Sequence, residues 1–173
     1  MAFSGWGLNW GGVINNRQGE WWLIAQIILI TAHLSPAWPS IEAYGIEWPK
    51  TLSFIGACIF FFGIVLAGKA FINLGPSLSP LPFPKAGASL ITFGSYKTCR
   101  HPLYKALLIS SCGVMIWLGS LLHMILFVFL CKVLISKAKK EEHQLKEVHS
   151  KYGQYIANTP AILKGIPFFD WQS

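Results

Sequence analysis

The chain has 173 residues, of which 53% are hydrophobic and only 12% charged, and its formal net charge is +7 at pH 7. Soluble domains average about 25% charged residues, so this composition excludes an ordinary water-exposed surface and favours a protein surrounded by lipid. The basic excess comes without a recognisable nucleic-acid-binding module, and the cysteines lack metal-ligand spacing, so we expect neither a nucleic-acid partner nor a metal site.

Residues 1–71 predict an interfacial arm followed by two membrane-spanning helices. Residues 1–20 are rich in Gly, Trp and Asn and show no helical periodicity, so we expect an arm at the membrane surface. Within residues 21–71, the stretches Trp21–Trp38 and Thr51–Phe71 each approach the roughly 20 apolar residues that a spanning helix needs. Three prolines within residues 35–50 predict a loop between the two helices.

Residues 72–105 predict a different kind of structure. The part from 72 to 100 contains four prolines and three glycines, which exclude a regular helix. It is too apolar for a free linker, so we expect it to lie along the membrane face and to pack on the helices.

Residues 106–136 predict a helical hairpin, and residues 137–173 a cytosolic helix and tail. From Ala106 to Ile135 the chain is uncharged except for Lys132. A single helix of this length would be about 45 Å long, whereas the hydrocarbon core is about 30 Å thick. The Gly119–Ser120 pair offers a break that would divide the stretch into two short helices.

These elements predict an all-α, polytopic transmembrane protein that forms a single membrane domain of about four spanning helices. With four spans, both termini lie on one side, together with every Lys and Arg except Lys50. The positive-inside rule then places both termini in the cytoplasm and makes the chain a multi-pass integral membrane protein.

Two polar clusters flank the predicted hairpin. The first contains Tyr96, Arg100, His101 and Tyr104, and the second contains Lys137, Glu141 and Glu142. An antiparallel hairpin brings its open ends together, so the clusters become neighbours and can form a pocket. Lys137 and Glu141 are four residues apart and share a helix face, whereas Glu142 points elsewhere. Taken alone, the second cluster is also typical of a solvated helix face with weak ion pairs, and Arg100 of a side chain that reaches lipid head groups.

Five elements occur in order around these clusters: "LGPSLSPLPFP", "LITFGSY", "RHPLY", the apolar hairpin, and "EEHQLKEVHSKYGQYIANTP" followed by "IP". The series resembles the isoprenylcysteine carboxyl methyltransferase-like branch of the integral-membrane methyltransferases, a group that also includes phospholipid N-methyltransferases. The resemblance covers about residues 72–167, and residues 1–71 match only as generic apolar helices.

The resemblance implies S-adenosylmethionine as methyl donor, bound without a soluble Rossmann-type fold. Carried over by position, the donor-binding residues are Ala88, Ser89, Leu90, Ile91, Tyr96, His101, Pro102, Leu103, Tyr104 and Glu141. The expected acceptor-binding residues are Lys137 and Arg100, and no catalytic side chain is assigned.

The chemistry of the donor agrees with this assignment. Its methionine end carries a carboxylate, which His101 and nearby backbone NH groups could bind, and an ammonium, which Glu141 could bind. The sulfonium is a cation that the face of Tyr104 could attract. The adenine needs an apolar slot, which could be lined by Leu90, Ile91 and Leu103.

The sequence therefore predicts a membrane methyltransferase whose acceptor is a lipophilic small molecule or a lipidated protein, with an isoprenylcysteine-type carboxylate among the candidates and membrane lipids as surroundings. Lys137 stands where the family often has Arg, and it keeps the charge but loses the bidentate fork. Ala106 replaces a common Gly, and His149–Ser150 replaces an aromatic–glycine pair.

One alternative function is that of a nicotinamide-dependent membrane reductase, although the phosphates of that cofactor need more Lys and Arg. The other is a non-enzymatic membrane protein whose polar clusters only anchor helices.

Overall fold

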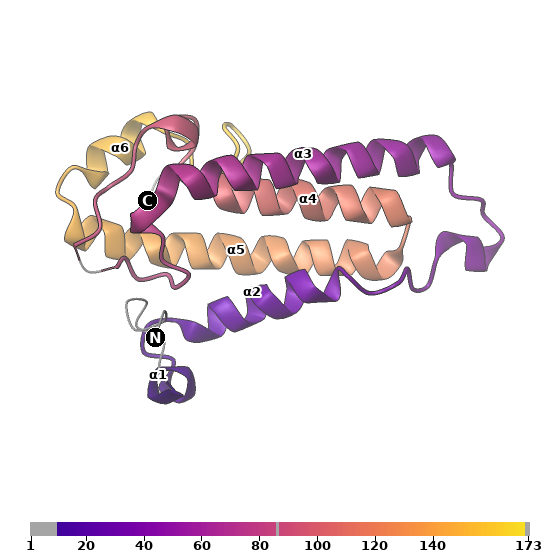
Figure 1. Ribbon diagram of the computed structural model, residues 1–173, viewed down its shortest axis with the longest axis horizontal. Helices are drawn as coiled ribbons and strands as arrows, with labels where there is room; N and C mark the ends of the chain where they lie inside the picture. Colours follow the sequence, from indigo (N-terminus) through magenta and orange to yellow (C-terminus); the bar gives the residue numbers. More distant parts are fainter. Residues whose placement is uncertain (1–9, 86, 172–173) are drawn as a thin grey trace.

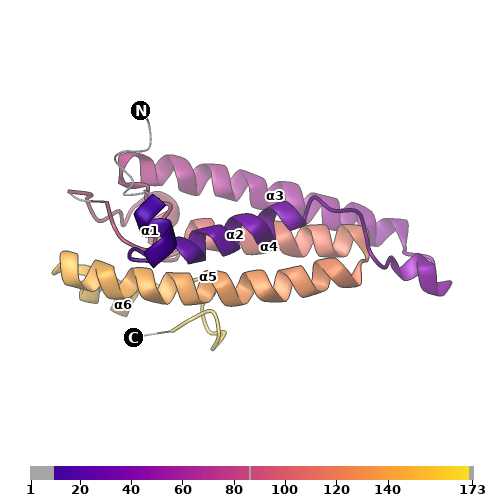
Figure 2. The same ribbon diagram turned by 90° about the horizontal axis from the view of Figure 1, so that it is seen from below.

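The structure, a computed structural model, describes residues 10–85 and 87–171, and within these ranges it contains helices and one isolated β-bridge but no strand. The all-α fold class is therefore confirmed. The helices are α1 (Trp10–Asn15), α2 (Glu20–Ala32), η2 (Ile41–Tyr44), α3 (Lys50–Leu74), η3 (Gly75–Ser77), η4 (Gly94–Lys97), α4 (Pro102–Leu118), α5 (Leu121–Val148) and α6 (Tyr152–Asn158). Figures 1 and 2 show α2, α3, α4 and α5 side by side in an elongated bundle, with α1 and α6 at one end and η2 at the other.

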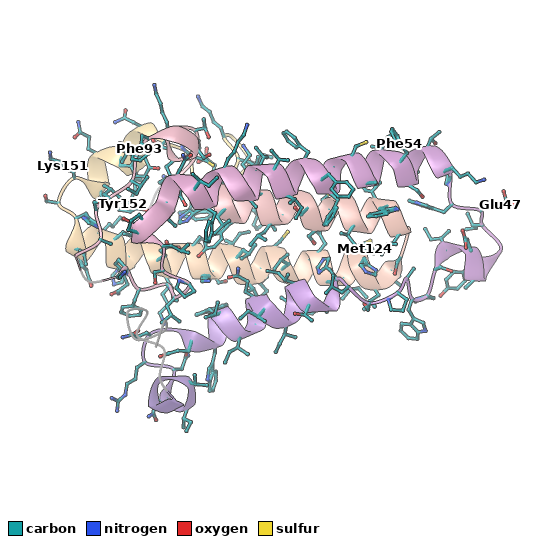
Figure 3. All side chains as sticks on the ribbon, in the orientation of Figure 1. Glu47, Phe54, Phe93, Met124, Lys151 and Tyr152 are labelled. Carbon is teal, nitrogen blue, oxygen red and sulfur yellow. The ribbon has the colours of Figure 1, made fainter. Side chains whose placement is uncertain are left out.

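Two helices of the bundle are long and apolar enough to cross a membrane. They are α3 together with η3, residues Lys50–Ser77, and α5. The outward side chains of α3 are large and apolar, as in Phe54, which is 72% exposed and projects from the bundle in Figure 3. Such a surface is favourable in lipid and unfavourable in water. Helices α2 and α4 are apolar but shorter, so four spanning helices stay a prediction.

Helix α2 is shorter than the sequence predicts. It ends at Ala32, whereas the predicted span continued to Trp38. Pro36 disfavours helical backbone in the residue before it, and the chain turns away from the helix axis. The turn then packs on the end of the hairpin, where the backbone NH of Trp38 donates to Ser120 Oγ at 3.0 Å and the NH of Leu122 donates to the Trp38 carbonyl at 3.1 Å.

Helices α3 and α4 form the most extensive helix contact of the bundle. Small residues allow this approach: a Cβ atom on Gly63 would lie 2.7 Å from the Ser110 backbone nitrogen, and one on Gly113 would lie 2.7 Å from Phe60 Cα. Small residues at such contacts are typical of membrane helices, because close packing rather than water exclusion drives their association.

Helices α4 and α5 are joined by a turn of two residues, Gly119 and Ser120. Gly119 ends α4 in the left-handed region, with φ 52°. Helix α4 begins at Pro102 rather than at Ala106, as suits a proline in the first turn. Helix α5 continues without a break to Val148, so the predicted boundary at residue 137 lies inside one helix of about 42 Å.

Candidate functional site

The predicted polar clusters meet at one end of the bundle. Figure 3 shows Phe93 and Tyr152 at this end and Glu47 at the opposite end. The C-terminal segment, residues 159–171, packs against the start of α4. The backbone NH groups of Arg100 and His101 donate to the carbonyls of Pro160 and Ala161, at 2.9 Å and 3.0 Å. Segments that are distant in sequence therefore form one site.

Arg100 is a structural centre of this site. Its side chain is almost fully buried, and its Nε donates to Glu142 Oε1 at 2.7 Å. Nη1 donates to the carbonyls of Ile156 and Thr159, and Nη2 donates to Glu142 Oε2 and to the Trp171 carbonyl. These bonds use every N–H donor of the guanidinium. Arg100 therefore ties α5, α6 and the C-terminal segment together and has no spare donor for a substrate.

His101 lies between the two glutamates of α5. Its Nε2 is 2.8 Å from Glu142 Oε1, and its Nδ1 is 3.9 Å from Glu141 Oε2. A carboxylate only accepts, so Nε2 carries a proton. The imidazole stacks on Tyr104, with ring centroids 5.4 Å apart, and on Trp171 at 6.0 Å. The Tyr104 hydroxyl donates to Glu141 Oε2 at 2.9 Å.

Lys137 is buried beside this group, with a side chain that is 2% exposed. Its ammonium donates to Gln26 Oε1 at 2.6 Å and to the Pro80 carbonyl at 2.7 Å. It also lies 5.5 Å from the centroid of the Tyr104 ring. An ammonium has three donors, and within the described part of the chain two of them have hydrogen-bond acceptors. Lys137 is therefore a buried positive charge with a donor left for a ligand.

Three tyrosines surround the outer part of the site. Burial, together with the Glu141 carboxylate, raises the pKa of the Tyr96 phenol well above its ordinary value. Burial and the Glu142 carboxylate do the same for the pKa of Tyr152, and burial raises the pKa of Tyr155. The Tyr155 hydroxyl donates to the Tyr96 carbonyl. These phenols stay neutral at physiological pH and act as hydrogen-bond donors rather than as bases.

Two cavities meet at a shared wall. The first has a volume of about 70 Å³ and the second about 240 Å³. Both are lined by Leu74, Ser79, Tyr96, Arg100, His101 and Glu141. A groove of about 540 Å³ adjoins the first cavity, with Leu90, His149 and Tyr155 in both linings. The second cavity extends between α2 and α3, where Leu23, Gln26 and Phe71 line it.

Most of the residues predicted from the sequence line these cavities. The first cavity is lined by Ala88, Ser89, Leu90, Ile91, Tyr96, His101 and Glu141. The second is lined by Leu103, Tyr104 and Lys137 in addition to the shared wall. Pro102 is buried at the start of α4 and is absent from both linings.

Sequence reasoning gave Glu142 no role and did not find Gln26 or Trp171. It listed Glu142 in the second polar cluster, pointing away from the face of Lys137 and Glu141, and the structure makes it the buried partner of both Arg100 and His101. Gln26 and Trp171 were not considered, because nothing near them in sequence indicates chemistry. The "EE" pair itself was the available signal: adjacent helix residues point about 100° apart, so each glutamate can serve a different group at a helix end.

Comparison with known proteins shows related sequences. The family model described as phospholipid methyltransferase matches residues 52–152, more than half of the chain. One curated relative, protein-S-isoprenylcysteine O-methyltransferase B of Arabidopsis thaliana, is 29% identical over 127 residues. The aligned part is 72% of this chain and 64% of the relative, so the chain spans less than two thirds of that relative. The matched range includes His101 and Glu141 and ends before Trp171.

Proposed function

Because this chain belongs to the phospholipid methyltransferase family, we propose that it transfers a methyl group from S-adenosylmethionine to a lipophilic acceptor. Family membership confirms the resemblance inferred from "RHPLY" and the residues around it, and it does not favour the reductase alternative. The observation that carries the proposal is the pair of cavities on either side of one wall that contains His101 and Glu141. Methyl transfer needs two substrates that meet at one point.

The first cavity and its groove suit the methyl donor. Glu141 faces the cavity as a carboxylate for the donor's ammonium. His101 is in the Nε2–H form, so its Nδ1 is an acceptor that suits the same ammonium rather than the donor's carboxylate, contrary to the expectation from the sequence. Leu90 and Ile91 supply apolar wall for the adenine. The cavity of about 70 Å³ is smaller than the roughly 300 Å³ of typical ligand sites, so the adjoining groove must hold part of the donor.

The second cavity suits the acceptor. It extends between the apolar helices α2 and α3, where a lipid chain would lie, and it contains the ammonium of Lys137. A buried cation favours an anionic acceptor and disfavours a protonated amine. Among lipophilic acceptors, we therefore propose a carboxylate such as that of an isoprenylcysteine rather than an amine head group. The lysine supplies the charge that such a carboxylate needs, although without a bidentate fork.

The proposed step balances without a general base. The bond between the methyl carbon and the acceptor oxygen forms as the bond between that carbon and the sulfonium sulfur breaks. The acceptor carboxylate becomes a neutral ester, and the donor becomes neutral S-adenosylhomocysteine. The role of the protein is to hold both reactants in line and to exclude water. Tyr96 in the shared wall and Tyr104 in the second cavity, as neutral phenols with aromatic faces, fit that role.

We place this end of the bundle on the cytoplasmic side of the membrane. The reason is the basic excess of the segments that gather there, with only Lys50 expected at the opposite end. A water-soluble donor would then reach the groove from the cytosol, while the acceptor enters from the bilayer.

Binding of S-adenosylhomocysteine to the purified full-length protein tests the proposal. We expect saturable binding by isothermal titration calorimetry and a loss of about tenfold to a hundredfold in Glu141→Gln, because one charged hydrogen bond disappears. Glu147→Gln is the matched control, since it removes the same charge from an exposed position of the same helix. Absence of binding to the wild type, or equal loss in both variants, would reject the donor site.

The acceptor is tested by its product. A membrane lipid extract and a farnesylated cysteine would be incubated separately with donor labelled in the methyl group. An ester in the labelled product is expected, and an N-methylated lipid would contradict the proposed acceptor class while leaving methyl transfer in place.

A further inference from the structure

Trp171 contacts three members of the site at once. Its indole Nε1 donates to Glu142 Oε2 at 2.9 Å, and its carbonyl accepts from Arg100 Nη2 at 2.5 Å. Its ring stacks on His101, with centroids 6.0 Å apart and an interplanar angle of 30°. The residue is buried, although it lies only two positions before the last residue of the chain.

A closed loop of the C-terminal segment holds Trp171 in this position. The Asp170 carboxylate accepts from the backbone NH of Ala161 at 3.2 Å and from that of Gly165 at 2.9 Å. The NH of Ile162 donates to the Phe169 carbonyl at 2.9 Å. Ala161 and Ile162 pack into the hydrophobic core. These hydrogen bonds fix the backbone of the loop, and the fixed loop places Trp171 in the site.

The indole and the Arg100 guanidinium together fix how Glu142 is presented to His101, because Arg100 bonds both carboxylate oxygens and Trp171 adds a second bond to Oε2. With Oε2 bonded to Trp171, Oε1 of Glu142 is the oxygen that accepts from His101 Nε2 at 2.8 Å. This bond keeps the proton on Nε2 and turns the Nδ1 side toward Glu141 and the first cavity. Tyr104 and Trp171 cover the imidazole by stacking, so its ring plane is held as well.

We propose that Trp171 is a positioning residue for ligand binding: through Glu142 it holds His101 in the Nε2–H tautomer with Nδ1 facing the donor cavity. The inference rests on the proposed function, because it takes S-adenosylmethionine or its product as the ligand that His101 meets. The family match ends at residue 152 and so assigns nothing to this tryptophan.

Trp171→Phe tests whether the hydrogen bond of the indole to Glu142, and not only the packing of the ring, matters for ligand binding. Phenylalanine keeps an aromatic ring against His101 but removes the N–H donor to Glu142. We expect S-adenosylhomocysteine to bind about tenfold more weakly, the size of one lost hydrogen bond to a charged group. Trp171→Ala removes the ring as well and should weaken binding further.

Two controls belong to the experiment. Phe168→Ala removes an aromatic ring from the same loop at a position that is 80% exposed. Lys139→Gln removes a cation that lies 5.5 Å from the centroid of the Trp171 ring but leaves the bond to Glu142. Both variants should bind the ligand as the wild type does.

The direct readout is the tautomer of His101. In ¹⁵N-histidine-labelled protein, the His101 signals are identified by their loss in His101→Asn. The wild type should show the Nε2–H form, and Trp171→Phe should show an admixture of the other tautomer, because Arg100 alone then holds the carboxylate and its bond to His101 weakens. A variant that keeps the wild-type spectrum and affinity would overturn the inference.

The two proposals fail in different ways. If the wild type does not bind S-adenosylhomocysteine, the donor site itself is rejected. If the wild type binds and Trp171→Phe binds equally well, only the positioning role of Trp171 is rejected. A lower melting temperature with unchanged affinity and tautomer would assign Trp171 to stability alone.

Discussion

The Nδ1 atom of His101 lies 3.9 Å from Oε2 of Glu141, although helix α4 and most of α5 separate the two residues in sequence. This distance is too long for a direct hydrogen bond and leaves both groups available to a polar ligand. Each residue also has a bonded neighbour: His101 Nε2 contacts Glu142, and the same Oε2 of Glu141 accepts from the Tyr104 hydroxyl. His101 and Glu141 are therefore held in place by bonds to Glu142 and Tyr104 rather than by a bond to each other.

Glu142→Gln should destabilise the protein more than any other single charge removal at this end of the bundle. The buried carboxylate faces Arg100, His101 and Trp171, and a neutral amide would leave the buried guanidinium without its counter-charge. Breaking such a pair costs about 3–5 kcal/mol. Denaturant unfolding in mixed micelles measures the loss. Glu147→Gln, at an exposed position, should change stability by less than about 0.5 kcal/mol. Similar losses in both variants would contradict the central role of Glu142.

Lys137→Gln should affect use of the acceptor but not binding of the donor. The first cavity does not include Lys137, so binding of S-adenosylhomocysteine should stay within about twofold of the wild type. The kcat/KM for an anionic acceptor should fall by about tenfold or more, since a charged contact is lost. Lys137→Arg should recover part of the activity, and Lys132→Gln, an exposed position on the same helix, serves as control. A parallel loss of donor binding would place Lys137 in the donor site instead.

Gly63→Ala should weaken the contact between α3 and α4. The new methyl group would lie 2.7 Å from the backbone nitrogen of Ser110 and 3.0 Å from the Ala106 carbonyl, so the helices must separate. Overpacking of this kind costs about 1–3 kcal/mol. Gly68→Ala, on the same helix, meets no atom within 4 Å and should be neutral or stabilising. Melting temperatures of the two variants, measured side by side, test the difference, and a Gly68→Ala loss as large as that of Gly63→Ala would contradict it.

Alkaline pH should destabilise the site end of the bundle through Tyr152. Burial and the Glu142 carboxylate raise the pKa of this phenol in the folded protein, so above the unfolded-state pKa of about 10 the folded state binds more protons than the unfolded state. Stability is then lost as pH rises through and beyond that value. Thermal unfolding between about pH 8 and pH 11 should show a shallower decline in Tyr152→Phe than in the wild type. An identical pH slope in the two proteins would show that Tyr152 does not contribute.

Local sequence patterns predicted the helices better than their ends. The apolar runs located α3 and α5, because a long uncharged stretch has few alternatives to a helix in lipid. Pro36 is a local signal for the early end of α2 at Ala32, whereas the bonds of Trp38 to the hairpin turn are contained in no local pattern. The predicted polar helix is a continuation of the second hairpin helix, and the change from apolar to polar composition near residue 137 marks no break in α5.

The candidate site was predictable where the residues are close in sequence. "RHPLY" and "EE" indicated His101, Tyr104 and Glu141, and the structure brings these three together. Which partners each of the two glutamates, Glu141 and Glu142, would bind was not predictable. It depends on which way each side chain points when α5 meets Arg100, and only packing of the helix sets that rotation.

By itself, the sequence determined the membrane environment, the helical class and the family, because composition, apolar run length and short motifs are local properties of the chain. Tertiary structure alone decided that Arg100 serves the fold, that Lys137 is buried against Gln26, and that Trp171 returns from the C-terminal loop to His101. The physical reason is that hydrogen-bond partners in this site come from segments far apart in the chain. Their distances are set by how the helices and the C-terminal loop pack, and that arrangement is a property of the whole fold rather than of any one segment.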